Sequence, residues 1–384
     1  MKMDNERGFM LSHPDEGGPR GCMTSEIETV AGLCNLVFRS TTGDMQREYP
    51  LLFHPDNSSR LRTVWENGQV ICHAGYVNRD AWILGMPLCT ASVGAVCTHP
   101  DHRGKGHAGR VMADVEESAR AEGCDILLVS GSRSLYQRMG CVPAGRFNTY
   151  RLKPPQIDPP GLIRHAVPED AHALVRLHQT QPVRFERSVD DWLLMLGSGM
   201  LMNTRADTWV VERDGEIVAY LGVQRAGNDG IARVREYAGS RTAVWSALGK
   251  AAAGASEIEV TQMPGDYDLE VLAGETATRS ERAFPGTIKI LKPGAFFEKA
   301  QALLFERVGE EIANDLTLST SDAEESVTFD WRRQYLDVEI NRLAALVFGP
   351  PPGLPGIPMP EDPLGSILRS LFPFPLLWYG YNYI

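Results

Sequence analysis

The chain has 384 residues, of which 43% are hydrophobic and 23% are charged. These values match average globular proteins and exclude a disordered, collagen-like or coiled-coil chain. At about 150 residues per domain, the length predicts two or three domains. The 38 basic and 49 acidic residues give a net charge of −11. General nucleic-acid binders are more often basic, so we expect no nucleic-acid partner, whereas an acidic surface is compatible with cationic substrates.

The cysteines are seven in number, form no C-x-x-C pair and all lie in the first 141 residues: Cys22, Cys34, Cys72, Cys89, Cys97, Cys124 and Cys141. An odd number at such spacing predicts buried thiols in a reducing, cytoplasmic compartment rather than a disulfide framework or a structural zinc site. The first residues, MKMDNERGF, have no apolar signal core, and no run of about 18 apolar residues follows anywhere. We therefore expect no membrane span.

The first predicted helix begins after residue 20. Ser25 and Glu28 have the spacing of a capping box, and the apolar residues that follow fall on one helical face: Ile27, Val30, Ala31, Cys34, Val37 and Phe38. A hairpin is expected next, with strands at 61–65 and 70–77 around the turn Asn67-Gly68, because Asn-Gly favours the turn whose twist matches paired strands.

A strand, a glycine-rich loop, a helix and a second strand are predicted between residues 91 and 129. Residues 91–98 and 126–129 read as buried strands. Between them, residues 107–122 carry an apolar stripe at helical spacing and end before Gly123.

Two proline-rich stretches, residues 154–160 and 350–363, are interpreted as a linker and an extended segment. After the first of them, residues 211–223 (VERDGEIVAYLGV) parallel residues 64–76 (VWENGQVICHAGY), at an offset of 147 residues. This similarity indicates a duplicated domain whose helices lie at 169–178 and 242–253.

The loop 103–108, sequence RGKGHA, carries the most informative chemistry. The first turn of a helix has backbone N–H groups without partners, and glycines allow these groups to close around a phosphate. Arg103 and Lys105 add positive charge. The loop therefore reads as a pyrophosphate site.

Gly104, Gly106 and Gly109 also satisfy G-x-G-x-x-G, the dinucleotide fingerprint. In that fold the glycines follow the first strand of the domain, and an acidic residue ends the next strand. Here about 90 residues precede the loop, and residues 126–129 lead into Ser130 instead. A nicotinamide or flavin site is therefore the weaker interpretation.

The same residues resemble the GCN5-related N-acetyltransferase (GNAT) superfamily. Its acyl-CoA loop, [QR]-x-x-G-x-[GA], is matched by Arg103, Gly106 and Ala108. About 30 residues later, residues 135–141 (LYQRMGC) match the family's L-Y-x-x-x-G-F motif, with Cys141 in place of phenylalanine. The resemblance implies acetyl-CoA as co-substrate, no metal, and a mixed α/β fold with a bulged, splayed strand and helices on both faces of the sheet.

The resemblance also implies which residues bind acetyl-CoA and which act in catalysis. Backbone groups of the splayed strand would face the pantetheine arm and the thioester, the loop would hold the phosphates, and Ser130 would lie on the cofactor side. The implied cofactor-binding residues are Val96, Cys97, Thr98, Arg103, Gly104, Lys105, Gly106, His107, Ala108 and Ser130.

In this family an amine attacks the acetyl thioester directly within a ternary complex. Tyr136 matches the tyrosine that protonates the leaving thiolate. The alternative is that Tyr136 only packs under its helix. For Cys97 we favour buried packing over a nucleophilic role.

Other residues near the loop carry weaker predictions. His99, His102 and His107 cluster there, and phosphate contact is favoured over metal binding because no zinc spacing is satisfied. Asp44 and Glu48 precede the hairpin and either hold a cationic amine or belong to a solvated loop.

The whole chain resembles the Eis-like (enhanced intracellular survival) subgroup. This implies three domains: an active GNAT domain at 1–153, a degenerate GNAT-like domain at 160–283 and a sterol-carrier-protein-like α+β domain at 284–384. The degenerate copy lacks R-x-x-G-x-A, so we expect it to bind no CoA and to form a wall of the acceptor cleft. A packing role is favoured over a lipid site in the third domain.

The aromatic tail, residues 371–384 (LFPFPLLWYGYNYI), is implied to return to the first domain. There the carboxylate of Ile384 would act as the catalytic base; alternatively, the tail only seals the core. The resemblance further implies a homo-oligomer, a hexamer.

The expected function is N-acetyl transfer to a primary amine of a small molecule or peptide. An aminoglycoside-like polyamine is the first candidate acceptor, and a protein or peptide lysine is the alternative. A CoA-binding sensor or scaffold without turnover is the non-enzymatic alternative.

Overall fold

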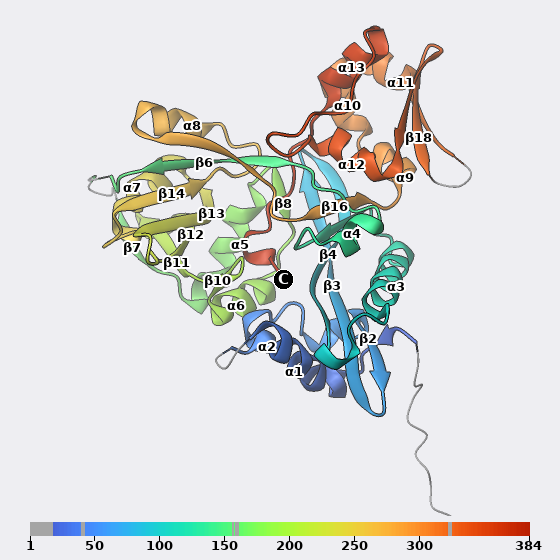
Figure 1. The fold of residues 1–384 in the computed structure, drawn as a ribbon. Helices are drawn as coiled ribbons and strands as arrows, with labels where there is room; N and C mark the ends of the chain where they lie inside the picture. Colours follow the sequence, from blue (N-terminus) through green and yellow to red (C-terminus); the bar gives the residue numbers. More distant parts are fainter. Residues whose placement is uncertain (1–17, 40–42, 156, 158–160, 322–324) are drawn as a thin grey trace, which may run out of the picture.

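The computed structural model describes residues 18–39, 43–155, 157, 161–321 and 325–384. They form two seven-stranded sheets, a three-stranded sheet, a short two-stranded ribbon and the helices around them. In Figure 1 the two large sheets lie side by side, and the end of the chain, marked C, lies between them. The predicted mixed α/β class is confirmed.

The first sheet has the order β1-β2-β3-β4-β5-β16, and β8 pairs with β3 at one end. Only β4 and β5 run parallel. Its strands are β1 (Arg20–Gly21), β2 (Leu61–Glu66), β3 (Gln69–Ile83), β4 (Met86–Thr98), β5 (Ile126–Val129), β8 (Val183–Phe185) and β16 (Thr287–Ile290).

Helices cover both faces of this sheet. Successive strand residues point to opposite faces, and Val70 packs in the core that holds α1 (Ile27–Phe38), whereas Ile71 packs in the core that holds α3 (His107–Ala121). The short helices α2 (Met45–Glu48) and α4 (Ser134–Arg138) complete this part of the fold.

The second sheet repeats this plan in the order β15-β6-β14-β13-β12-β11-β7, with only β13 and β14 parallel. Its strands are β6 (Arg146–Leu152), β7 (Leu162–His165), β11 (Asp207–Arg213), β12 (Glu216–Gln224), β13 (Ile231–Gly239), β14 (Glu257–Thr261) and β15 (Thr278–Ala283). Its helices are α5 (Ala171–Gln179), α6 (Val189–Ser198), α7 (Arg241–Ala251) and α8 (Asp268–Ala273), and the ribbon is β9 (Met200–Leu201) with β10 (Thr204–Arg205).

The predicted repeat extends to details of pairing. The β2–β3 hairpin has a register shift between Val64 and Trp65, and the β11–β12 hairpin has one between Val211 and Glu212. Residues 64 and 211 are 147 positions apart, the offset found in the sequence. Both copies thus share a local irregularity as well as a strand order.

The predicted domain boundaries at 153, 160 and 284 do not coincide with the sheets. β6 belongs to the second sheet, where it pairs with β14 and β15. β8 and β16 pair with β3 and β5 of the first sheet. Tyr150 and Leu152 of β6 are buried in the second core, so burial of apolar side chains draws this strand away from the first sheet.

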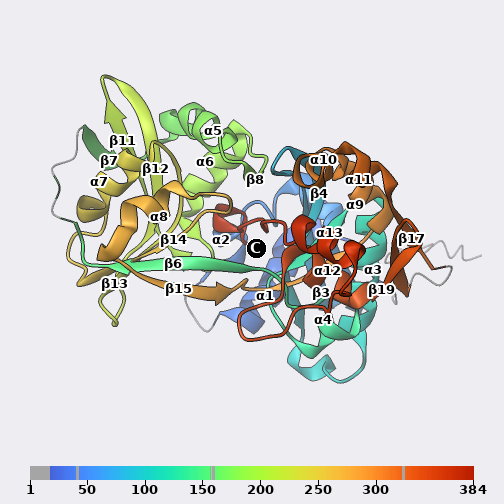
Figure 2. The ribbon, with the colours of Figure 1, turned by 90° about the horizontal axis from the view of Figure 1, so that it is seen from above.

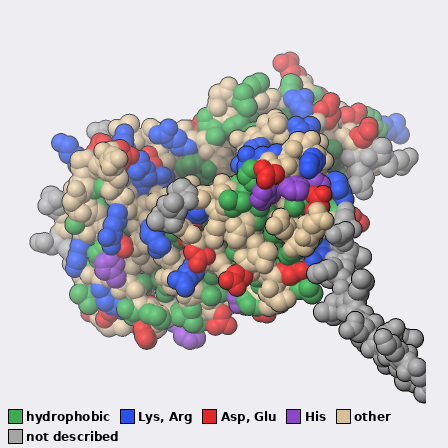
Figure 3. Space-filling view, turned by 60° about the horizontal axis from the view of Figure 1, so that its bottom comes forward, with side chains coloured by type: hydrophobic (Ala, Val, Ile, Leu, Met, Phe, Trp, Pro, Cys, Tyr) green, Lys and Arg blue, Asp and Glu red, His purple; other side chains and the backbone are tan. Residues whose placement is uncertain are grey.

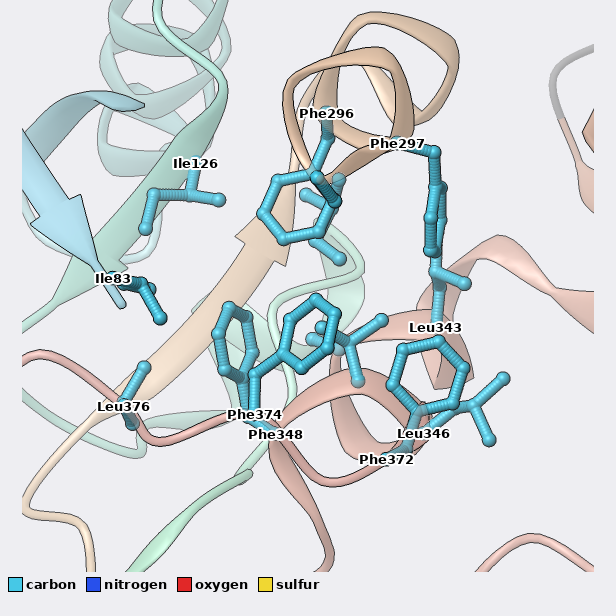
Figure 4. Packing of buried hydrophobic residues seen from close by; sticks show 14 of the residues in the cluster. Ile83, Ile126, Phe296, Phe297, Leu343, Leu346, Phe348, Phe372, Phe374 and Leu376 are labelled. Atoms are coloured by element: carbon cyan, nitrogen blue, oxygen red, sulfur yellow. The ribbon is translucent and has the colours of Figure 1, made fainter. Parts of the chain in front are cut away.

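The third unit consists of the sheet β17 (Leu316–Thr320), β18 (Ser326–Trp331) and β19 (Gln334–Glu339) with five helices. These are α9 (Pro293–Lys299), α10 (Gln301–Val308), α11 (Glu310–Asp315), α12 (Ile340–Phe348) and α13 (Pro363–Leu371). Figure 1 and Figure 2 show the unit over the half of the molecule that holds the first sheet. Its aromatic core includes Phe296, Phe348 and Phe372 and is continuous with Ile83 and Ile126 of the first sheet (Figure 4).

The start of the first helix differs from the prediction. A 3₁₀ turn, Thr24–Glu26, precedes α1, and Glu26 accepts a hydrogen bond from the backbone N–H of Met23 at 2.7 Å. Arg20 also binds Glu26. The predicted Ser25–Glu28 capping box is therefore wrong, because Glu26 caps the turn two residues earlier.

After α13 the tail runs between the two large sheets. Phe374 bonds the carbonyl of Val347 in the third unit, Trp378 bonds the carbonyl of Arg235 in the second sheet, and Ile384 lies against β4 of the first sheet. The tail therefore contacts all three units before it ends.

Candidate active site

The site lies where β4 and β5 separate. The two strands are paired from Thr90–Ile126 to Val93–Val129, and β5 ends there while β4 continues to Thr98. On β4, Gly94 and Cys97 are three residues apart, whereas their partners on β3, residues 75 and 73, are two residues apart. Between them, Ala95 has a φ of +52°. This extra residue is a β-bulge, so the predicted bulged and splayed strand is present.

The predicted pyrophosphate loop lies beside this split. Gly104 and Gly106 have φ values of +77° and +82°, which favour glycine, and Gly106 is the N-cap of α3. A Cβ atom at either position would meet nothing within 4 Å. The backbone of this turn is therefore open to a ligand at the positive end of the helix.

A cavity of about 600 Å³ extends from this loop along β4. All of the predicted cofactor-binding residues line it except Ser130: Val96, Cys97, Thr98, Arg103, Gly104, Lys105, Gly106, His107 and Ala108. Arg133 and Arg138 line it too, and no Asp or Glu side chain is among its described lining residues. We call it the cofactor cavity, since its volume, glycine turn and positively charged lining suit acetyl-CoA.

The sequence did not identify Arg133 and Arg138 as site residues. They lie at and near the ends of α4, the helix that carries the L-Y-x-x-x-G motif. Leu135 and Met139 of the same segment also line the cavity, so basic residues beside the L-Y-x-x-x-G motif are the signal that could have identified them.

A second cavity of about 190 Å³ lies at the other end of the split. We call it the acceptor cavity. It holds Tyr136, Ser130 and, from the tail, Tyr383 and Ile384. Residues in or next to α1, α2 and the ribbon complete its lining: Phe38, Arg39, Met45, Tyr49 and Asn203. Val96 and Arg133 line both cavities, so the two meet beside the bulge.

Ile384 is held closely in this place. The Ser130 hydroxyl donates to an oxygen of Ile384 at 2.8 Å, and Ile384 is 5% exposed. Ser130, expected on the cofactor side, lies in the acceptor cavity instead, because its backbone N–H bonds the carbonyl of Val93 at the point of the split.

Tyr136 is buried and lines the acceptor cavity. Burial raises the pKa of its hydroxyl above the ordinary value, although the nearby Arg133 guanidinium opposes the rise. The hydroxyl is therefore protonated at neutral pH, as a proton donor must be.

The cysteines are thiols, six of them buried. The Cys97 sulfur lies 3.8 Å from that of Cys34, and this neighbour together with burial raises the pKa of Cys97 well above the ordinary value. A protonated, buried thiol is a poor nucleophile, which supports the packing role.

The histidines lie near the loop without forming a metal site. His107 lines the cofactor cavity at the start of α3, and the rings of His99 and His102 stand edge to face with centroids 5.7 Å apart. Within the described ranges, no group of three or more His, Cys, Asp or Glu side chains could hold a metal ion.

Asp44 and Glu48 have structural partners and do not line the acceptor cavity. Asp44 accepts from the N–H groups of Gln46 and Arg47 at the start of α2. Glu48 accepts from the Arg39 guanidinium, with one bond of 2.8 Å, so it neutralises the arginine that lines the cavity. Neither carboxylate is placed to bind an amine directly.

The split of the second sheet is different. The parallel pairing of β13 and β14 ends at Val234 and Val260. The next turn has no glycine cradle: Ser240 caps α7 with its own side chain, at the N–H of Ala243, and Arg241 bonds the carbonyl of Gly239. The tail lies in this split, where Trp378 donates to the carbonyl of Arg235 at 2.7 Å.

A comparison with protein families matches the part of the chain that carries most of this site. Residues 19–144, about a third of the chain, match the model of an acetyltransferase (GNAT) domain. This range includes the glycine turn, the split of β4 and β5, and α4. Residues 19–144 therefore form a GNAT acetyltransferase domain. No curated protein matches the sequence.

Solved structures share the fold over most of the chain. A GCN5-related N-acetyltransferase from Anabaena variabilis superposes with a TM-score of 0.61 at 14% identity, covering 86% of this chain and 89% of that one. A probable N-acyltransferase from Enterococcus faecalis superposes with a TM-score of 0.58 at 12% identity, covering 84% of each chain. Eis1 from Mycobacterium abscessus superposes with a TM-score of 0.56 at 14% identity, covering 86% of this chain and 89% of that one. At these identities the likeness concerns the fold alone.

Among the described residues, none of the helices has the length and apolar character needed to cross a membrane.

Proposed function

We propose that the chain is an acetyl-CoA-dependent N-acetyltransferase that acts on a primary amine in a ternary complex. The observation that carries this proposal is the junction of the two cavities at Val96 and Arg133. A cofactor that entered along the glycine turn would present its thioester there, with Tyr136 and Ile384 on the acceptor side.

Two proton transfers are assigned to this chain's residues. As the amine nitrogen bonds the acetyl carbon, the carboxylate of Ile384 takes the proton that the nitrogen loses. As the carbon–sulfur bond breaks, the Tyr136 hydroxyl gives its proton to the leaving thiolate, and the N–H groups of Val96 and Thr98 are the candidate donors to the carbonyl oxygen. A free α-carboxyl group has a pKa of about 3.5, so it serves as a base when it is desolvated or acts through water.

The acceptor cavity bears on the choice of amine. Its described lining includes two arginine side chains and four aromatic ones, but no Asp or Glu side chain. In the face drawn in Figure 3, acidic and basic side chains are intermixed, so the net charge of −11 forms no single acidic area there. These features favour one amine on a slim apolar or aromatic body, such as a lysine side chain or a small arylalkylamine, over the expected aminoglycoside-like polyamine.

The remaining expectations add to the proposal. An Eis-like organisation is supported by the order of the three units, with a tail that reaches the first sheet, and the third unit is proposed to act in packing, since its core is continuous with that of the first sheet. A cytoplasmic location and a homo-oligomer stay proposals by resemblance.

Release of the CoA thiol from acetyl-CoA tests the proposal. The acceptors are a lysine peptide, an arylalkylamine, a polyamine and an aminoglycoside, and mass spectrometry of each product locates the added acetyl group. Tight binding of CoA without amine-dependent thiol release would instead support the sensor or scaffold alternative.

A tail extension tests the role of Ile384. The intact mass first establishes that Ile384 carries the terminal carboxyl group. Three added residues should then lower kcat at least tenfold while the dissociation constant of CoA stays within twofold. Full activity in a folded, extended protein would refute the role of this carboxylate.

A further inference from the structure

The tail occupies equivalent places in the two large sheets. In the first sheet, Gly94 follows the last parallel pair of β4 and β5, and Ile384 lies against it. In the second sheet, Arg235 follows the last parallel pair of β13 and β14, and its carbonyl accepts the Trp378 indole N–H. The tail therefore lies beside the split in both copies, and in the first copy the split also opens to the cofactor cavity.

The residue after Arg235 belongs to a buried ion pair. Glu236 and Arg187 bond through both guanidinium Nη atoms, at 2.5 and 2.9 Å, and their side chains are 4% and 1% exposed. Tyr220 donates to the same carboxylate at 2.8 Å. Arg187 follows β8, the strand that pairs with β3 of the first sheet. The pair thus joins the core of the second unit to a strand of the first.

The remaining bonding capacity of this pair is used on the tail. Glu236 Oε2 accepts from the backbone N–H of Tyr381 at 3.2 Å, and Arg187 Nε donates to the Asn382 side-chain oxygen at 2.7 Å. The approach is so close that a Cβ atom on Gly380 would lie 1.7 Å from Glu236 Oε2.

Burial of two charges is costly, and a buried ion pair often stabilises a protein no better than apolar residues of the same size. Its forked geometry, however, fixes orientation, because both guanidinium and carboxylate bond in defined directions. Here the ion pair fixes the orientation of the tail. Only Tyr383 separates Asn382, which bonds the pair, from Ile384.

We infer that the second unit acts as a tail holder, in which Arg187 and Glu236 are positioning residues that set the carboxylate of Ile384 in the acceptor cavity. The inference rests on the proposed function of that carboxylate. It gives the second copy a role: its split receives residues 378–382 of the same chain in place of a cofactor.

Two variants test the inference without leaving one buried charge unpaired. Arg187→Met with Glu236→Leu removes both charges at similar volume, and Gly380→Ala displaces the tail from an intact pair. The matched control is Arg164→Met with Asp170→Leu, a forked pair in the second unit whose bonds of 2.7 and 2.9 Å join β7 to the start of α5. Thermal unfolding identifies folded variants.

Hydrogen exchange of the amides of residues 379–384 measures tail holding without catalysis. Exchange should become at least tenfold faster in both test variants and stay unchanged in the control. With an active acceptor, kcat should fall at least tenfold while the KM for acetyl-CoA stays within twofold. Unchanged exchange in both variants would overturn the inference, as would faster exchange at an unchanged kcat. If the wild type turns over no amine, the proposed function fails, and the exchange data still decide whether the pair holds the tail.

Discussion

Gly94 lies directly against Ile384: a Cβ atom at position 94 would be 2.3 Å from the oxygen of Ile384 and 2.4 Å from its carbonyl carbon. Real Cβ atoms do not approach other atoms so closely, so the absence of a side chain on β4 is what admits the end of the tail. This contact makes Gly94 a steric probe of the proposed base.

The Gly94→Ala variant should displace the carboxylate of Ile384 and lower kcat at least tenfold. Steady-state kinetics measures the effect, and binding of CoA should change little because Gly94 lines the acceptor cavity and not the cofactor cavity. Gly32→Ala is the control, since that glycine lies in α1 with nothing within 4 Å of an added Cβ. Wild-type turnover in Gly94→Ala would contradict the proposed place of the base.

Tyr136→Phe should lower kcat about a hundredfold, the usual contribution of a general acid. Burial raises the pKa of Tyr136, so its acid form persists above the ordinary range, and its loss by deprotonation should affect the wild-type rate only at strongly alkaline pH. The pH profile of kcat in wild type and variant measures both effects.

Tyr150→Phe is the matched control for this variant. Tyr150 is also buried, and burial also raises the pKa of its hydroxyl, but it lies on β6 in the second core. A Tyr136→Phe enzyme with the turnover of this control would reduce Tyr136 to a packing residue.

The local parts of the site could be predicted from the sequence because local rules govern them. The glycine turn depends on the φ values of Gly104 and Gly106, and the L-Y-x-x-x-G motif places Tyr136 on its helix within a few residues. The turn Asn67-Gly68 likewise encodes its own hairpin.

The long-range parts could not be predicted in this way. The exchange of β6 into the second sheet depends on which core buries Tyr150 and Leu152. From the sequence, Glu48 is a candidate acceptor-binding carboxylate. In the structure it is paired with Arg39, nine residues away. Arg187 and Glu236 are 49 residues apart, and their pairing and their bonds to the tail exist only in the folded chain.

The loss of positive charge in the phosphate loop should weaken cofactor binding. Arg103→Gln and Lys105→Gln should each raise the KM for acetyl-CoA about tenfold, since a hydrogen bond to a charged group contributes on the order of 1.5–3 kcal/mol. The effect should diminish at high salt because these side chains are exposed.

Dephospho-CoA and CoA as inhibitors indicate which phosphate each side chain contacts. Arg47→Gln is the control, because that side chain is 88% exposed and does not line the cofactor cavity. Equal inhibition constants for wild type, Arg103→Gln and Lys105→Gln would show that these two side chains do not contribute to phosphate binding.

Stability should fall as the pH decreases below about 6.5, because two histidines are buried in the neutral form. Burial lowers the pKa of His73 to about 4 and that of His178 to about 3. An unfolded histidine has a pKa of about 6.5, so below that pH the unfolded chain binds protons that the folded chain does not. The stabilisation is complete well above pH 6.5 and is lost progressively toward pH 4 for His73 and toward pH 3 for His178. Urea unfolding at pH 7.5 and 5 measures this loss, and its pH dependence should become shallower in His73→Gln. An identical dependence in wild type and variant would show that His73 is not held neutral in the fold.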